Sequence, residues 1–144
     1  MNEIIKNLYL TDFERATNFQ ILTEHKVNLV INCTRECIHK KKCENVDYIK
    51  IDIDDDPSYD IFSHFDKITD TIHQYLNNNK VVLVHCKYGK SRSVSMIIAY
   101  LIKYKNMNFE NSLDLVKQKR KSACPNSGFV QQLNKFSEKY QLPT

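Results

Sequence analysis

One nine-residue segment, from His85 to Ser93, constrains the fold of this chain more than any other feature. The apolar run before it, residues 80–84, is short and rich in valine, which is typical of a buried strand. The run after it, residues 94–102, is apolar on almost every side, which predicts a helix with neighbours all round. A strand, a loop and a helix are therefore expected to follow one another directly.

The loop in this arrangement is predicted to bind an anion. Backbone N–H groups at the start of a helix point into one concavity, where their partial positive charge favours a phosphate or a thiolate. Cys86 lies where the loop begins, and a cysteine at such a place with cationic neighbours is commonly ionised at neutral pH. Arg92, six positions later, can bind two phosphate oxygens with its planar guanidinium. The segment thus combines an anion cradle with a nucleophile.

Glycine is rare in this chain, which contains only Gly89 and Gly128. Gly89 falls inside the loop, where a positive φ or a close approach of the backbone to a ligand requires it. With this glycine in place, the string H-C-x-x-G-x-S-R-S resembles the signature of the cysteine-dependent protein tyrosine phosphatase superfamily. The short chain around it resembles a dual-specificity phosphatase over essentially its whole length.

The resemblance implies a fold and a reaction. The fold is α/β, with a central, mostly parallel twisted sheet flanked by helices and the phosphate loop between a buried strand and the central helix. In the reaction, the Cys86 thiolate attacks phosphorus in line, and water then hydrolyses a phosphocysteine intermediate, so no metal or other cofactor is needed. Short members of the superfamily have a shallow pocket, which implies phosphotyrosine and phosphoserine or phosphothreonine in proteins as substrates.

The resemblance also implies roles for individual residues. His85 supports the loop by hydrogen bonding and helps to keep the thiol ionised, and Ser93 donates its hydroxyl hydrogen to the departing thiolate. Asn126 braces the loop from a distant turn, or caps the last helix, and the two roles are compatible. The substrate-binding residues implied are those of the loop itself: Lys87, Tyr88, Gly89, Lys90, Ser91 and Arg92.

A proton donor for the leaving oxygen is expected in the acidic triplet Asp54, Asp55 and Asp56. In families of this kind the acid lies about thirty residues before the cysteine, on a loop entering a helix. Asp55 lies 31 positions before Cys86 and is our prediction for the general acid. Asp54 is the nearest alternative, because a one-residue difference in loop length would exchange the two. Asp56 could instead cap the helix that begins near Pro57.

Two lysines within the loop, Lys87 and Lys90, depart from the pattern of many dual-specificity phosphatases. Lysine at both positions is also seen in phosphoinositide phosphatases of the superfamily, so an inositol lipid or another polyanionic phosphate is the alternative substrate. Alternatively, both side chains point to solvent and only add positive potential. A phosphate-binding module without turnover is a further alternative, which the presence of Cys86, Arg92 and an acid disfavours.

A zinc site is a third interpretation, for a different part of the sequence. Cys33, Cys37, His39 and Cys43 place four possible ligands within eleven residues. The spacing lacks a C-x-x-C pair, and Cys33 lies in a predicted buried strand, so we expect no metal site there.

Composition limits the remaining possibilities. A chain of 144 residues with 42% hydrophobic content suffices for one core, so residues 1–144 are expected to form a single catalytic domain. The net charge of +4 suits an anionic substrate but falls short of a nucleic-acid-binding protein. No run of 18 uncharged apolar residues occurs, so no stable membrane insertion is expected. Five cysteines without a secretory signal indicate a reducing compartment, the cytoplasm or nucleus.

Hydrophobic periodicity predicts the remaining elements. Strands are expected near residues 8–10, 27–31 and 46–53, where apolar and β-branched residues cluster. Apolar residues at three- and four-residue spacing predict a helix over residues 61–76, ending at the asparagines 77–79. Other helices are expected over residues 13–22 with Thr11 and Asp12 at the N-cap, after Asn108, and from Phe129 to Tyr140.

Overall fold

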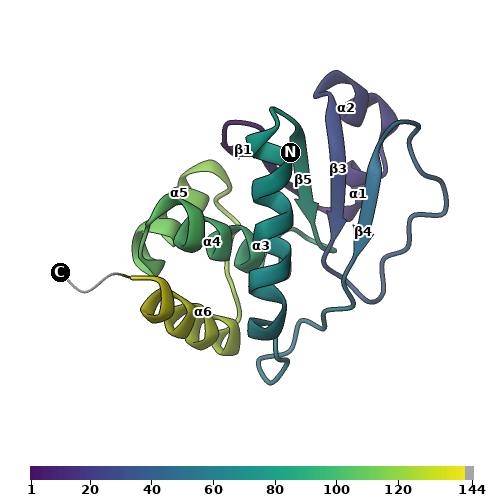
Figure 1. The fold of residues 1–144 in the computed structure, drawn as a ribbon. Coiled ribbons are helices and arrows are strands. Elements are labelled where there is room, and N and C mark those ends of the chain that lie inside the picture. Colours follow the sequence, from purple (N-terminus) through teal and green to yellow (C-terminus); the bar gives the residue numbers. More distant parts are fainter. Residues whose placement is uncertain (142–144) are drawn as a thin grey trace.

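The chain folds around a five-stranded sheet with helices on both faces (Figure 1). This computed structural model describes residues 1–141. The strands are β1 (Asn2–Ile5), β2 (Leu8–Thr11), β3 (Val27–Asn32), β4 (Asp47–Lys50) and β5 (Val81–His85). The helices are α1 (Phe13–Ala16), α2 (Phe19–Glu24), α3 (Phe62–Asn77), α4 (Arg92–Lys105), α5 (Phe109–Lys119) and α6 (Ser127–Tyr140).

The sheet has the strand order β1-β2-β5-β3-β4 and is parallel except for β1, which pairs with β2 in the antiparallel sense at one edge. All five residues of β5 are buried, because β5 lies at the centre and both of its faces are covered. The predicted α/β class with a mostly parallel sheet is confirmed. The carboxyl ends of β2, β5 and β3 meet at one edge, and the predicted phosphate loop begins there.

Two cores flank the sheet. The larger one joins β2, β3 and β5 to α3, α4 and α6, and the smaller one packs α1 and α2 against the opposite face. Helix α4 lies in the middle of the larger core, and its residues 92–102 are all buried. This burial is predicted by the apolar run after the loop, and it fixes the loop at the start of α4 to the least mobile part of the fold.

Two of the predicted elements were wrong, and one strand was not predicted. The single helix predicted over residues 13–22 is two short helices, because Asn18 caps a new one by accepting the N–H of Ile21 at 3.2 Å. The strand predicted over residues 46–53 is only β4, since its neighbour β3 ends at Asn32 and offers no further ladder partners. The edge strand β1 had not been predicted.

Asp56 does not cap α3. Its carboxylate accepts the backbone N–H and the hydroxyl of Ser58, both at 2.8 Å, and so closes a tight turn before the helix. The first turn of α3 is instead served by Asp60, which accepts the N–H of Ser63 at 3.1 Å. The capping asparagines Asn108 and Asn126 were predicted correctly. Within residues 1–141, no helix has the length and apolar character that crossing a bilayer requires.

Candidate active site

The loop between β5 and α4 curls with its carbonyl oxygens facing outward. Every carbonyl from Cys86 to Ser91 has a partner outside the loop's concavity. These partners are His85 Nδ1 for residue 86, Phe13 N–H for 87, Arg120 for 88 and 89, Cys124 N–H for 90 and Ser95 N–H for 91. Because the peptide unit is planar and trans, a carbonyl turned outward turns the following N–H inward. The loop amides therefore converge on one centre.

Cys86 lies at the floor of that concavity. Its sulfur accepts the N–H of Gly89 at 3.2 Å and lies 3.0 Å from the hydroxyl oxygen of Ser93. Only 3% of Cys86 is exposed, so little more than a phosphoryl group can approach the sulfur. Gly89 has φ 68°, and a Cβ there would lie 2.9 Å from the backbone carbonyl oxygen of Thr11, so both the conformation and the space require glycine.

Arg92, the first residue of α4, is buried and held from two sides. Nη1 and Nη2 donate to the two oxygens of Glu36 at 2.7 and 2.8 Å, and Nη1 also donates to the carbonyl of Ile53 at 3.0 Å. A guanidinium has five N–H donors. Among residues 1–141, the Nε–H and the second hydrogen of Nη2 have no acceptor, and these two form one edge of the group. That edge is free to bind two oxygens of one phosphate.

The same ion pair changes the acidity of Glu36. The hydrogen bond from Arg92, together with backbone and charge effects, lowers the pKa of Glu36 to about 2. Glu36 is therefore charged throughout the neutral range, and the Arg92 side chain keeps its orientation without a substrate. Glu36 had not been predicted from the sequence. Its place just after the carboxyl end of β3, beside the end of β5, is the signal that could have identified it.

Of the three aspartates in the acidic loop, only Asp55 contacts the residues around the phosphate loop. Its Oδ1 accepts Asn126 Nδ2 at 3.0 Å, and the backbone N–H of Asn126 donates to Ser91 Oγ at 2.9 Å. Asn126 also accepts the N–H of Phe129 at 2.8 Å, so it caps α6 and braces the loop at once. Asp54 instead accepts Arg35 Nε at 3.0 Å on the exposed surface.

His85 lies at the end of β5 and is fully buried. Nδ1 is 3.1 Å from the carbonyl of Cys86, and Nε2 is 2.8 Å from Nε2 of His39. Burial lowers the pKa of His85 to about 4, so the ring is neutral at pH 7. It can hold the loop by hydrogen bonding, as expected, but it brings no positive charge to the thiol. His39, which completes this pair, had not been assigned to the site.

Lys87, Tyr88 and Lys90 lie on the outer rim of the loop and are exposed. The Lys87 ammonium is 5.2 Å from the centroid of the Tyr88 ring, within the range of a cation–π contact. Arg120 was missed by the sequence analysis because nothing in its local pattern indicates that it reaches the loop. The four residues considered for zinc give no such centre: no group of three or more possible ligands gathers anywhere in residues 1–141.

Comparisons with known proteins agree with this geometry. The family model described as "Dual specificity phosphatase, catalytic domain" matches residues 8–139. The "Putative tyrosine phosphatase 123R" of Invertebrate iridescent virus 6 is 34% identical over 134 residues, which cover 93% of this chain and 89% of that protein. "Dual specificity protein phosphatase 22" of Homo sapiens is 33% identical over 142 residues, 99% of this chain and 76% of that one. The crystal structure of human DUSP28 superposes with a TM-score of 0.92 at 26% identity, covering 96% of both chains.

Proposed function

Since this chain belongs to the dual-specificity phosphatases, we propose that Cys86 is the nucleophile of its reaction, Arg92 its phosphate-binding residue and Asp55 its proton donor. The protein is a cysteine-dependent phosphatase of phosphotyrosine and phosphoserine or phosphothreonine, and it acts on phosphorylated proteins. The family model spans 132 of the 144 residues, which supports residues 1–144 as a single catalytic domain.

One observation carries the assignment of the nucleophile: six consecutive carbonyls are turned outward around the sulfur of Cys86. The inward amides offer the same donors to a thiolate before the reaction and to the phosphoryl oxygens during it. Their dipoles are fixed by partners elsewhere in the fold, so they need no reorganisation as charge develops. The free edge of Arg92 adds two more donors at the same centre.

In the first step, the Cys86 thiolate forms a bond to phosphorus while the bond to the leaving oxygen breaks. Asp55, in its protonated form, transfers a proton to that oxygen. Asn126 links Asp55 to Ser91, which keeps the acid at a fixed place relative to the phosphate loop. The products of this step are the dephosphorylated hydroxyl side chain, phosphocysteine and an ionised Asp55.

In the second step, water attacks phosphorus and gives a proton to the Asp55 carboxylate. The bond between sulfur and phosphorus breaks, and the thiolate of Cys86 departs. The hydroxyl of Ser93, 3.0 Å from the sulfur, donates a hydrogen bond to it at that moment. Inorganic phosphate leaves, and both side chains return to their starting protonation states.

Trapping the intermediate tests this assignment. The enzyme is mixed with an aryl phosphate, quenched in acid, digested and analysed by mass spectrometry for a phosphoryl group on the peptide that contains Cys86. We expect that modification in the wild type and neither modification nor turnover in Cys86→Ser. Cys124→Ser, which removes an exposed cysteine near the loop, should leave both unchanged. Turnover that survives in Cys86→Ser, or a phosphoryl group on another residue, would refute the assignment.

A further inference from the structure

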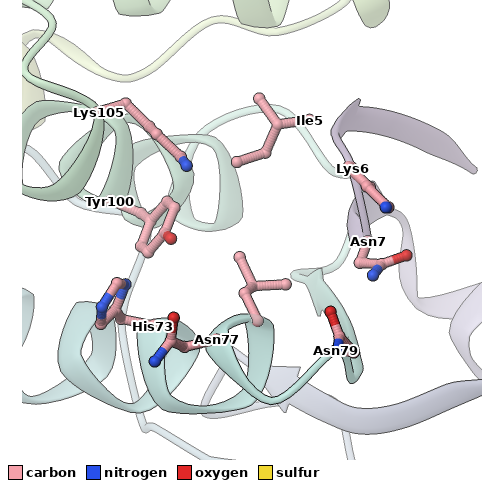
Figure 2. A pocket seen from close by; sticks show the side chains of 9 residues that line it. Ile5, Lys6, Asn7, His73, Asn77, Asn79, Tyr100 and Lys105 are labelled. Carbon is pink, nitrogen blue, oxygen red and sulfur yellow. The ribbon is translucent and has the colours of Figure 1, made fainter.

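A hollow of about 340 Å³ opens at the end of the sheet opposite the phosphate loop (Figure 2). Its walls are the turn between β1 and β2, the C-terminal turn of α3 and the last turns of α4. Strand β5 begins beside the hollow and ends at His85, next to Cys86, so the length of that strand separates the hollow from the phosphate loop. The volume is within the range of small-molecule sites, roughly 300–1,000 Å³.

Tyr100, on α4, supplies the first sign of a ligand. Tyr100 is only 1% exposed, yet its hydroxyl makes no hydrogen bond within residues 1–141 and points into the hollow (Figure 2). Burial raises the pKa of Tyr100, and no hydrogen bond contributes to that rise. The hydroxyl oxygen is not among the fully buried atoms that lack a partner, so it stays accessible from the hollow. The hydroxyl therefore offers an unused donor to whatever enters the hollow.

His73, on α3, supplies the second. Its ring lines the hollow beside Tyr100, and its Nδ1 is buried without a hydrogen-bond partner in the described chain. The ring is held in place by stacking on Tyr104, with centroids 4.0 Å apart and planes 8° from parallel. One wall of the hollow is thus rigid and polar, and its hydrogen-bonding capacity is not used by the protein.

The charge of the lining is positive. Lys6 and Lys105 lie on opposite sides of the hollow, and the ammonium of Lys105 points into it (Figure 2). Neither lysine belongs to an ion pair within residues 1–141, and no lining residue carries a carboxylate. Glu3, which is close by on β1, is engaged by the backbone N–H of Asn7 at 3.1 Å. The partial negative charges at the ends of α3 and α4 are smaller than these two full charges.

We propose that this hollow binds a small organic oxyanion, a carboxylate or a phosphate ester with an apolar body. The oxygens accept hydrogen bonds from the Tyr100 hydroxyl and from the ammonium group of Lys105, and Lys6 at the rim adds positive charge. The apolar body packs on Ile5 and Leu76, which line the same hollow. This site is separate from the catalytic loop and does not depend on the roles proposed there.

Titration followed by NMR tests the proposal, because each backbone amide reports its own site. The probes are sodium benzoate, a carboxylate, and phenylphosphonate, which resembles a phosphate ester and is not hydrolysed. We expect saturable shifts at residues 6, 7, 77, 79 and 105, with a dissociation constant in the millimolar range or tighter. Shifts from benzoate assign the ligand as a carboxylate, and shifts from phenylphosphonate alone assign it as a phosphate ester. Shifts confined to the phosphate loop, or none, would overturn the proposal.

Substitutions test which side chains of the hollow contribute to binding of the probe. Lys6→Gln with Lys105→Gln should weaken binding about fivefold to tenfold, whereas Lys67→Gln with Lys117→Gln, an equal change of charge at exposed lysines elsewhere, should not. Tyr100→Phe should weaken binding about threefold or more without lowering the unfolding temperature, because the hydroxyl it removes has no partner in the protein. Binding that is unchanged in the Lys6 and Lys105 variant would overturn the site as described. Aryl phosphate hydrolysis should be normal in all of these variants.

Discussion

The carboxylate of Glu36 binds Arg92 end-on, at 2.7 Å from Nη1 and 2.8 Å from Nη2, and leaves the side edge of the guanidinium to a phosphate. An unpaired arginine would lose rotamer freedom on binding the substrate. Here that freedom is already lost in the free enzyme, because Glu36 and the carbonyl of Ile53 fix the group from two sides. Glu36 acts on the substrate only through Arg92 and is a positioning residue.

Glu36→Gln should raise the KM for an aryl phosphate about tenfold, which corresponds to about 1.4 kcal/mol, and change kcat much less. An amide presents one oxygen and one NH₂ group, so one of the two bonds to Arg92 becomes a clash between donors. Steady-state kinetics measures the effect, and Glu138→Gln on the exposed face of α6 is the matched control. A fall in kcat with KM unchanged would contradict a positioning role.

Asp55→Asn should slow the reaction by roughly 10²–10⁴, and Asp54→Asn should change it little. The structural reason is that Asp55 is tied to the loop through Asn126, while Asp54 is paired with Arg35 on the surface. The loss should be greater for phosphothreonine than for an aryl ester with an acidic phenol, because an acidic phenol leaves without a proton. The same dependence on the leaving group in Asp54→Asn, and not in Asp55→Asn, would exchange the two assignments.

Local sequence was sufficient for the phosphate loop because its parts are contiguous. Cys86, Gly89 and Arg92 lie within seven residues, and the flanking strand and helix are strongly patterned. Glu36 and Arg120 lie 56 and 28 positions from Arg92 in the sequence, and their contacts with the loop depend on tertiary packing. A single charged residue has no periodicity that announces such a contact. The roles of these residues became visible only with the fold.

The helices and strands were likewise predicted well only where the sequence pattern is local and extended. Helices α3 and α4 were predicted well because their apolar patterns extend over several turns. The break between α1 and α2 was missed since Asn18 has ordinary helix neighbours, and only its cap bond to Ile21 shows that a new helix begins. Strand β4 was predicted too long because its β-branched residues continue into a buried segment. There Ile51 still donates its N–H to Asn32 at the end of β3, but Ile53 packs in the core without a strand partner.

His85 should make the protein lose stability as the pH falls from 6.5 toward 4. Its folded-state pKa of about 4 is below the usual 6.5, so between these values the unfolded chain binds the proton and the folded protein does not. The contribution of His85 to the free energy of unfolding is at its full value above pH 6.5, and about 3 kcal/mol of it is lost by pH 4. Urea unfolding at several pH values measures the slope, and NMR of the ring should show it neutral at pH 5. A ring that is protonated at pH 6 would contradict this.

Lys87 and Lys90 should act on substrates through their charge, since both side chains are exposed at the rim of the loop. Replacing both with alanine should raise the KM for a phosphopeptide with acidic flanking residues about threefold to tenfold at low salt, and less at high salt. The KM for a phosphopeptide with neutral flanking residues should change little. Replacing Lys67 and Lys117 with alanine serves as the control. Wild-type turnover of soluble inositol phosphates that equals or exceeds turnover of phosphotyrosine and phosphothreonine peptides would favour the polyanionic substrate instead.

Gly128→Ala should damage catalysis through the acidic loop. A Cβ at Gly128, in the first turn of α6, would lie 1.8 Å from the carbonyl oxygen of Pro57, and backbone on both sides cannot yield as a side chain could. The loop must move outward, and Asp55, two residues before Pro57, moves with it away from Asn126. Alanine favours helix over glycine by about 1 kcal/mol, so the change need not unfold α6.

The loss of kcat in Gly128→Ala should therefore resemble that of Asp55→Asn, greater for poor leaving groups and with little change in KM. The double variant should lose little more kcat than Asp55→Asn alone, because a displaced acid and a missing acid remove the same proton transfer. Ser127→Ala, at the exposed neighbouring position, is the control, and thermal unfolding verifies that each variant is folded. If the two effects simply add, Gly128 acts on something other than the placement of Asp55.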